Sequence, residues 1–189
     1  MGVTDSIRGE FVRYKALAEA AMAQVDDAQL SVPPAPGGNS IATICWHVSG
    51  NLRSRFTDFL TTDGEKPWRR RDEEFDPRTV TRAELLTTWE AGWSVLFAAL
   101  SELTDTHLGQ TVVIRGQSLR VDEALHRSLA HAAYHAGQIV LLAKTRRGDE
   151  WQSLSIPPGK SDAANRAPAM QRPEEHAQAL RERNSRAQH

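Results

Sequence analysis

The 189-residue chain contains a single cysteine, Cys45, which excludes an intrachain disulfide framework and any zinc site built from several cysteines. A metal site would therefore have to use the seven histidines and the acidic residues. The chain also lacks an excess of either charge, because 23 Lys and Arg stand against 24 Asp and Glu. Since no overall positive field would attract phosphates, we expect no nucleic-acid partner.

Long apolar runs are missing as well, so the sequence predicts no membrane span and no membrane partner. Residues 1–20 carry charged side chains throughout, which a secretory signal would not tolerate. We therefore expect a cytoplasmic protein. Its length is typical of one domain with one core.

Four segments repeat apolar residues at three- and four-residue steps, the pattern of amphipathic helices. They are residues 5–30, 41–62, 82–104 and 121–147. Ser40 is a plausible N-cap for the second segment, and Thr81 with Glu84 forms a capping box before the third. Gly148 is positioned to end the fourth. The predicted fold is all-α, a four-helix bundle.

Two further segments complete this prediction. The β-branched run and glycine within residues 111–120 indicate a short β-hairpin before the last bundle helix. Residues 1–162 would form the bundle domain and residues 163–189 a polar C-terminal tail, with a short helix over Glu174–Arg183. We expect this tail to be ordered only if a neighbour or a second chain holds it, because Met170 and Leu180 are its only larger aliphatic side chains.

The residues between the last bundle helix and the tail form an extended connection. Trp151, Leu154 and Ile156 are its large apolar side chains. We expect these three to pack back on the bundle.

The sharpest chemical signal is His131-Ala-Ala-Tyr-His135 in the fourth helix. Residues four apart lie on one helix face, so the two imidazoles can converge on one ion. His47, at the border of the apolar face of the second helix, is a candidate third donor. Three imidazoles would favour zinc or nickel, or iron, over magnesium or calcium. The alternative is a set of partly buried histidines held by hydrogen bonds.

These residues also carry a family resemblance. Trp46-His47-Val-Ser-Gly-Asn51 in the second helix, with His131-x-x-x-His135-Ala-Gly-Gln-Ile139 in the fourth, resembles the DinB/YfiT-like superfamily of metal-binding four-helix bundles. Residues 54–75 and 153–161 look like its uncharacterised DUF1572 branch. The resemblance covers about residues 1–165 and leaves the tail uncovered.

The resemblance implies that His47, His131 and His135 bind a divalent metal, and that the protein is a homodimer. Characterised relatives include S-transferases that use a low-molecular-weight thiol such as bacillithiol, and a mycothiol-dependent maleylpyruvate isomerase. We therefore expect a metal-dependent enzyme acting on a small-molecule substrate, with thiol-dependent S-transfer as the most concrete reaction. The alternatives are a metal-dependent hydrolase and a metal- or small-molecule-binding module without turnover.

The sequence identifies no catalytic group, but Asn51 and Gln138 are candidates to hydrogen-bond a ligand or orient an imidazole. Either amide could equally face solvent or a neighbouring helix. Cys45 lies within the apolar stripe of its helix, so we expect a buried, inert thiol.

A group of arginines stands near the predicted metal site in the sequence: Arg53, Arg55, Arg69, Arg70 and Arg71. Their guanidinium groups could gather a carboxylate-bearing cosubstrate. The alternative, favoured for any single arginine, is a solvated face balanced by Asp72, Glu73 and Glu74.

Overall fold

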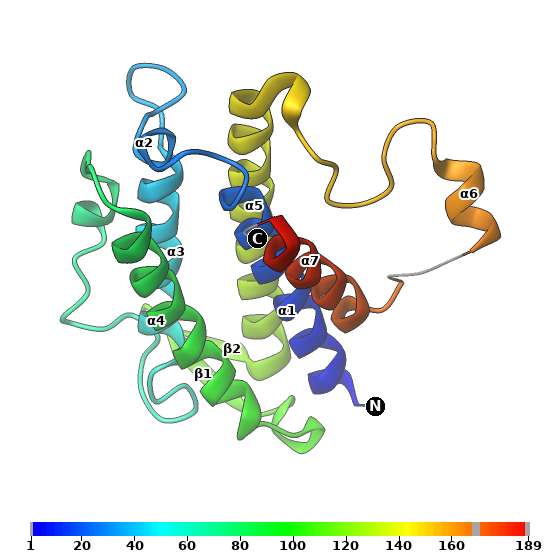
Figure 1. Ribbon diagram of the computed structural model, residues 1–189. Coiled ribbons are helices and arrows are strands. Elements are labelled where there is room, and N and C mark those ends of the chain that lie inside the picture. Colours follow the sequence, from blue (N-terminus) through cyan, green and yellow to red (C-terminus); the bar gives the residue numbers. More distant parts are fainter. Residues whose placement is uncertain (1, 168–170, 188–189) are drawn as a thin grey trace.

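The computed structural model describes residues 2–167 and 171–187, and its four longest helices form the predicted bundle (Figure 1). They are α1 (Val3–Met22), α3 (Ile41–Phe56), α4 (Arg82–Ser101) and α5 (Val121–Arg147). Helix α3 packs mainly along α4 and helix α1 mainly along α5, so the bundle consists of two helix pairs. None of the described helices is both long and apolar enough to cross a membrane.

The predicted caps are present at two helix starts. The Ser40 hydroxyl accepts a hydrogen bond from the Thr43 backbone N–H at the start of α3. Thr81 and Glu84 form a reciprocal capping box at the start of α4. Each cap satisfies backbone donors that a helix start otherwise leaves without partners.

Some helix ends differ from the predictions. Helix α1 ends at Met22 and is followed by the short α2 (Asp27–Leu30) instead of continuing to residue 30. Helix α3 ends at Phe56 and not near residue 62, because Thr57 is extended and Asp58 has a positive φ of 49°. A left-handed residue cannot continue a right-handed helix, although the apolar spacing runs on past it.

The core lies between the two helix pairs. Its largest fully buried side chains include Phe11, Leu52, Leu85, Trp89, Trp93, Leu125 and Ile139. A Cβ added at Gly92 of α4 would lie 2.5 Å from the Ser49 Cα of α3. Glycine at this position therefore allows the two helix backbones to approach closely.

The predicted hairpin is present as β1 (Thr111–Ile114) and β2 (Gln117–Arg120), paired antiparallel. Its two turn residues, Arg115 and Gly116, both have positive φ, as a tight hairpin turn requires. The Gly64 N–H donates to the Val113 carbonyl, and the Asp63 carboxylate accepts from both turn amides. The hairpin thereby holds the connection between α3 and α4, which also contains the 3₁₀ helix η1 (Asp72–Phe75).

The C-terminal segment is more ordered than its composition suggests. It contains α6 (Ser161–Arg166) and α7 (Pro173–Ala187), and α7 packs against α1 (Figure 1). Leu180 is 1% exposed and belongs to the buried core, so this part of the predicted tail is held by the same chain. Composition alone could not predict this packing, because it depends on a tertiary contact in which Ala177 and Leu180 of a mostly polar helix are buried. Met170 lies outside the described residues.

The connection that leads to α7 contains the 3₁₀ helix η3 (Gly148–Glu150), and η2 (Asp105–His107) precedes the hairpin. Leu154 is buried and Trp151 packs against the core, as predicted. Ile156 is 45% exposed, so its predicted packing was wrong. The His176 Nε2 of α7 bonds the Leu154 carbonyl at 2.8 Å, which joins the connection to the helix.

Candidate metal centre

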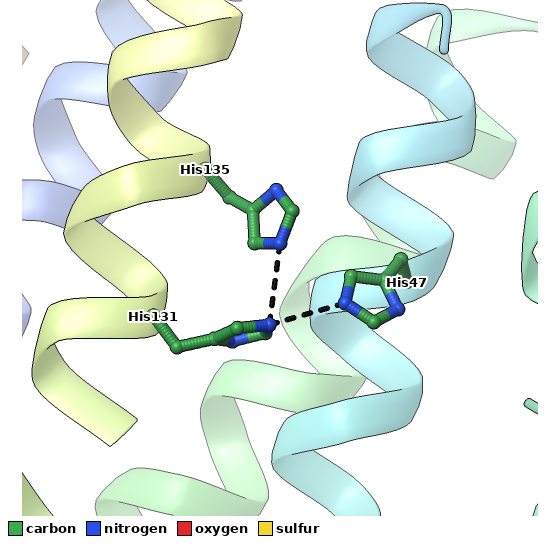
Figure 2. A group of neighbouring side chains, drawn as sticks. All are labelled: His47, His131 and His135. Carbon is green, nitrogen blue, oxygen red and sulfur yellow. Dashed lines mark hydrogen bonds between the residues drawn. The ribbon is translucent and has the colours of Figure 1, made fainter. Parts of the chain in front are cut away.

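Three histidines from the two helix pairs converge at one point (Figure 2). His47 comes from α3, and His131 and His135 come from successive turns of α5. The His131 Nε2 lies 3.1 Å from the His47 Nε2 and 3.2 Å from the His135 Nε2. One nitrogen from each ring lies within 4.8 Å of the others. The convergence expected from the sequence is therefore present.

The orientation of His47 is set by a buried carboxylate. Its Nδ1 lies 2.9 Å from the Glu74 Oε2, and Glu74 also accepts two hydrogen bonds from the Arg69 guanidinium, at 2.8 and 2.9 Å. Burial raises the pKa of Glu74, but the hydrogen bonds from His47 and Arg69 outweigh it and hold that pKa below its ordinary value. Because an ionised carboxylate can only accept, the Nδ1 of His47 carries a proton. In neutral His47 the Nε2 lone pair then faces the other two rings.

His135 is oriented by a neutral amide on its own helix. Its Nδ1 lies 2.8 Å from the Gln138 Oε1, and the Gln138 Nε2 donates to the Tyr134 hydroxyl at 2.9 Å. The amide oxygen accepts, so the Nδ1 of His135 donates and the Nε2 of the neutral ring again presents a lone pair to the group. Gln138 therefore hydrogen-bonds a histidine of the group, and its functional role stays a prediction.

Burial favours the uncharged form of the His131 and His135 imidazoles. It lowers the pKa of His131 to about 3, with further lowering from the charges of His135 and His47. It lowers the pKa of His135 to about 4, with His47 contributing and the Gln138 hydrogen bond opposing. Metal coordination requires deprotonated ring nitrogens, so these environments favour the ligand form.

Glu74 was missed as a site residue by the sequence reasoning, which placed it on a solvated face. Its position depends on η1, an irregular element with no periodic signal, and on a helix-interior glycine. A Cβ at Gly50 of α3 would lie 2.2 Å from the Glu74 Oε1. Gly50 therefore leaves the space that the carboxylate occupies beside His47. A lone glycine in a predicted helix is the sequence signal that points to such a close approach.

The other residues predicted to act near the metal site, Asn51, Arg53 and Arg55, have different surroundings. Asn51 lines a cavity beside His47 and His131. Arg55 bonds the Gly64 carbonyl and Glu65, while Arg53 lies over the Trp68 ring, 5.5 Å from its centre.

The charged run of residues 69–74 divides into two parts. Arg70 pairs with Glu73 and Arg71 with Asp72 on the exposed surface, as the solvated-face alternative expects. Arg69 and Glu74 instead pair inside the protein, since their side chains are only 2% and 9% exposed.

Cys45 takes no part in the site. Its side chain is fully buried, and its thiol contacts the Met22 sulfur at 3.5 Å. Burial, with a smaller contribution from Glu19, raises the pKa of the thiol well above its ordinary value. Since the thiolate is the nucleophilic form, this cysteine is inert, as predicted.

Comparison with known proteins gives a fold match and a family. A crystal structure titled as the conserved protein of locus from Enterococcus faecalis matches 79% of this chain and 99% of its own, with a TM-score of 0.61 and 18% sequence identity. At that identity the likeness concerns the fold. No curated protein matches the chain. The family model described as "Protein of unknown function (DUF1572)" matches residues 3–160, and the chain therefore belongs to the DUF1572 family.

Proposed function

We propose that His47, His131 and His135 hold one divalent metal ion through their Nε2 atoms. In a tetrahedral zinc site with bonds of roughly 2.0–2.1 Å, neighbouring ligand nitrogens lie about 3.3 Å apart. The two closest separations here, 3.1 and 3.2 Å, are near that value. The tautomers set by Glu74 and Gln138 also direct lone pairs to the common point. An imidazole donor set favours zinc, nickel or iron over magnesium or calcium.

We further propose that the site is reactive and not merely structural. Three protein ligands leave at least one coordination position, and the observation that carries the proposal is the cavity that adjoins His47 and His131. A structural metal is normally enclosed by four protein ligands, and no fourth candidate donor is grouped with the trio among the described residues.

The reaction that we propose is metal-dependent transfer involving a low-molecular-weight thiol, in line with the DinB/YfiT-like resemblance of the three ligand positions. A bound ion would favour the nucleophilic thiolate form of such a cosubstrate, or lower the pKa of water in the hydrolase alternative. The chain's own part is to orient the imidazoles through Glu74 and Gln138 and to leave room for the small molecule.

The expected homodimer also stays a proposal, which light scattering of the purified protein tests.

Elemental analysis tests the metal ligands. The purified protein should carry about one divalent ion per chain, and the double variant His131→Ala, His135→Ala should lose it. His126→Ala is a matched control, because His126 is an exposed histidine on the same helix, outside the histidine group. Stoichiometric metal retained by the double variant would refute the ligand assignment.

A second experiment tests the thiol. Titrating cobalt-substituted protein with bacillithiol, mycothiol and glutathione should produce a thiolate-to-cobalt charge-transfer band for a cosubstrate thiol. Unchanged spectra with all three, together with hydrolysis of an ester or amide panel, would replace the transferase proposal with the hydrolase.

A further inference from the structure

A small cavity next to the histidine group is unusually rich in arginine. It encloses about 180 Å³ and is bordered by His47 and His131. Helix α3, the connection after it, the hairpin turn and α5 each contribute guanidinium groups to its wall, from Arg55, Arg69, Arg71, Arg115 and Arg127. Within the described parts of the chain, no carboxylate belongs to this wall.

Only part of this positive charge is balanced by nearby acids. The Glu65 Oε2 accepts hydrogen bonds from both Arg55 and Arg115, so one carboxylate serves two guanidinium groups. Glu74 balances Arg69. Two carboxylates behind the wall therefore serve three of its five arginines.

The remaining two arginines of the wall are exposed and add to this surplus. Arg71 lies 3.6 Å from the fully exposed Asp72, and its guanidinium lies over the Phe75 ring, 5.1 Å from its centre. Arg127 is exposed and makes no ion pair with any residue in the described ranges. Because both side chains are exposed, their guanidinium groups can turn toward a ligand without breaking a buried ion pair.

Arg69 supplies a more specific sign of a missing partner. Its side chain is 2% exposed, yet its Nη1 is buried and forms no hydrogen bond with any described residue. The Nε and Nη2 atoms are directed at Glu74, so Nη1 faces the opposite side, where the Glu65 Oε2 lies 3.9 Å away, too far for a hydrogen bond. Leaving a charged donor buried and unpaired is unfavourable, and because Arg69 borders the cavity, an acceptor oxygen that reached Nη1 from there would remove that cost.

We propose that this cavity binds the oxyanion group, a carboxylate or a phosphate, of the small-molecule substrate of the adjoining metal site. Arg69 would receive one oxygen in the interior, while Arg127 and Arg71 would close over the anion from the rim. Arg55 and Arg115, which already share the Glu65 carboxylate, would add positive charge to the cavity wall. The small volume and the formal net charge of −1 favour a small anion over a nucleic-acid backbone.

This inference rests on the proposed metal site for its purpose, but its test does not need the metal. Calorimetric titration of the metal-free, full-length protein with inorganic phosphate and with succinate should give saturable binding of at least one anion. The anion that binds more tightly identifies the oxyanion class of the substrate, phosphate or carboxylate. The metal content of the histidine variants tests the metal site, whereas the titration tests the anion site. A negative result in one experiment therefore leaves the other proposal standing.

The decisive comparison is between two exposed arginines. Arg127→Gln should weaken anion binding about tenfold, the effect of losing one charge-assisted hydrogen bond. Arg70→Gln removes the same charge from a residue that does not border the cavity and should change the dissociation constant less than twofold. Because both positions are exposed, neither variant should unfold, which thermal denaturation checks.

Three outcomes would overturn the proposal. They are the absence of saturable binding of both anions, an equal loss in the Arg127 and Arg70 variants, and tighter, strongly salt-dependent binding of a DNA oligonucleotide than of either small anion.

Discussion

The two outer histidines of the group, His47 and His135, are supported in opposite ways. His47 is bonded by Glu74, a buried carboxylate delivered from an irregular segment 27 residues along the chain and held in turn by Arg69. His135 is bonded by Gln138, a neutral amide one helical turn away. Both arrangements place a proton on Nδ1 and direct Nε2 to the centre, so the same ring orientation is reached by an ionic and by a neutral route.

The difference lies in charge and in distance along the chain. A carboxylate partner makes its imidazole a more basic ligand than an amide partner does, because its negative charge stabilises positive charge developing on the ring. It also ties ligand geometry to the fold of the α3–α4 connection, whereas Gln138 depends only on α5 remaining helical. We therefore expect substitution of Glu74 to lower metal affinity more than substitution of Gln138.

The largest effect should follow from Glu74→Gln. This variant keeps the side chain's shape but removes the charge that faces both His47 and Arg69. We expect metal affinity to fall about 10- to 100-fold, measured by competition with a chelating dye. An affinity within twofold of the wild-type protein would show that the carboxylate does not support the ligand.

Gly50→Ala should also lower metal affinity, although it substitutes neither a metal ligand nor a hydrogen-bond partner of one. The new methyl group would lie 2.2 Å from the Glu74 Oε1, so the carboxylate must move away from His47. The expected decrease in metal affinity is about tenfold, of the same kind as for Glu74→Gln but smaller, because the charge stays nearby.

The matched control is Gly137→Ala on α5, next to Gln138. A Cβ there would meet nothing within 4 Å. This variant should keep full metal affinity and gain about 0.8–1 kcal/mol of unfolding free energy from the better helix former, measured by urea denaturation. Equal affinities for the Gly50 and Gly137 variants would mean that Glu74 is not held in place by the space at Gly50.

The contrast between local and distant partners also explains which parts of the site the sequence could predict. His131 and His135 are local partners four residues apart, so helical geometry alone places them together. His47 required a prediction of the fold as well, and the bundle was predictable because apolar residues recur at three- and four-residue steps in all four segments.

The position of Glu74 was not predictable in this way. It depends on where Asp58 ends α3, on how Asp63 fastens the connection to the hairpin turn, and on the space at Gly50. None of these tertiary contacts has a periodic signal. The acidic run around Glu74 is also indistinguishable by composition from a solvated surface.

The smallest effect should come from the amide side. Gln138→Ala removes the acceptor of the His135 Nδ1 proton, but Gln138 is only partly buried, so water can take its place. We expect metal affinity to fall no more than about threefold, because an exchanged neutral acceptor changes the basicity of the ring little. Tyr134→Phe, which removes the hydroxyl that accepts from Gln138, should have no measurable effect. If Gln138→Ala instead matched the loss in Glu74→Gln, ring orientation and not the charge of the partner would be the property that both supports provide, and the asymmetry between His47 and His135 would have no energetic meaning.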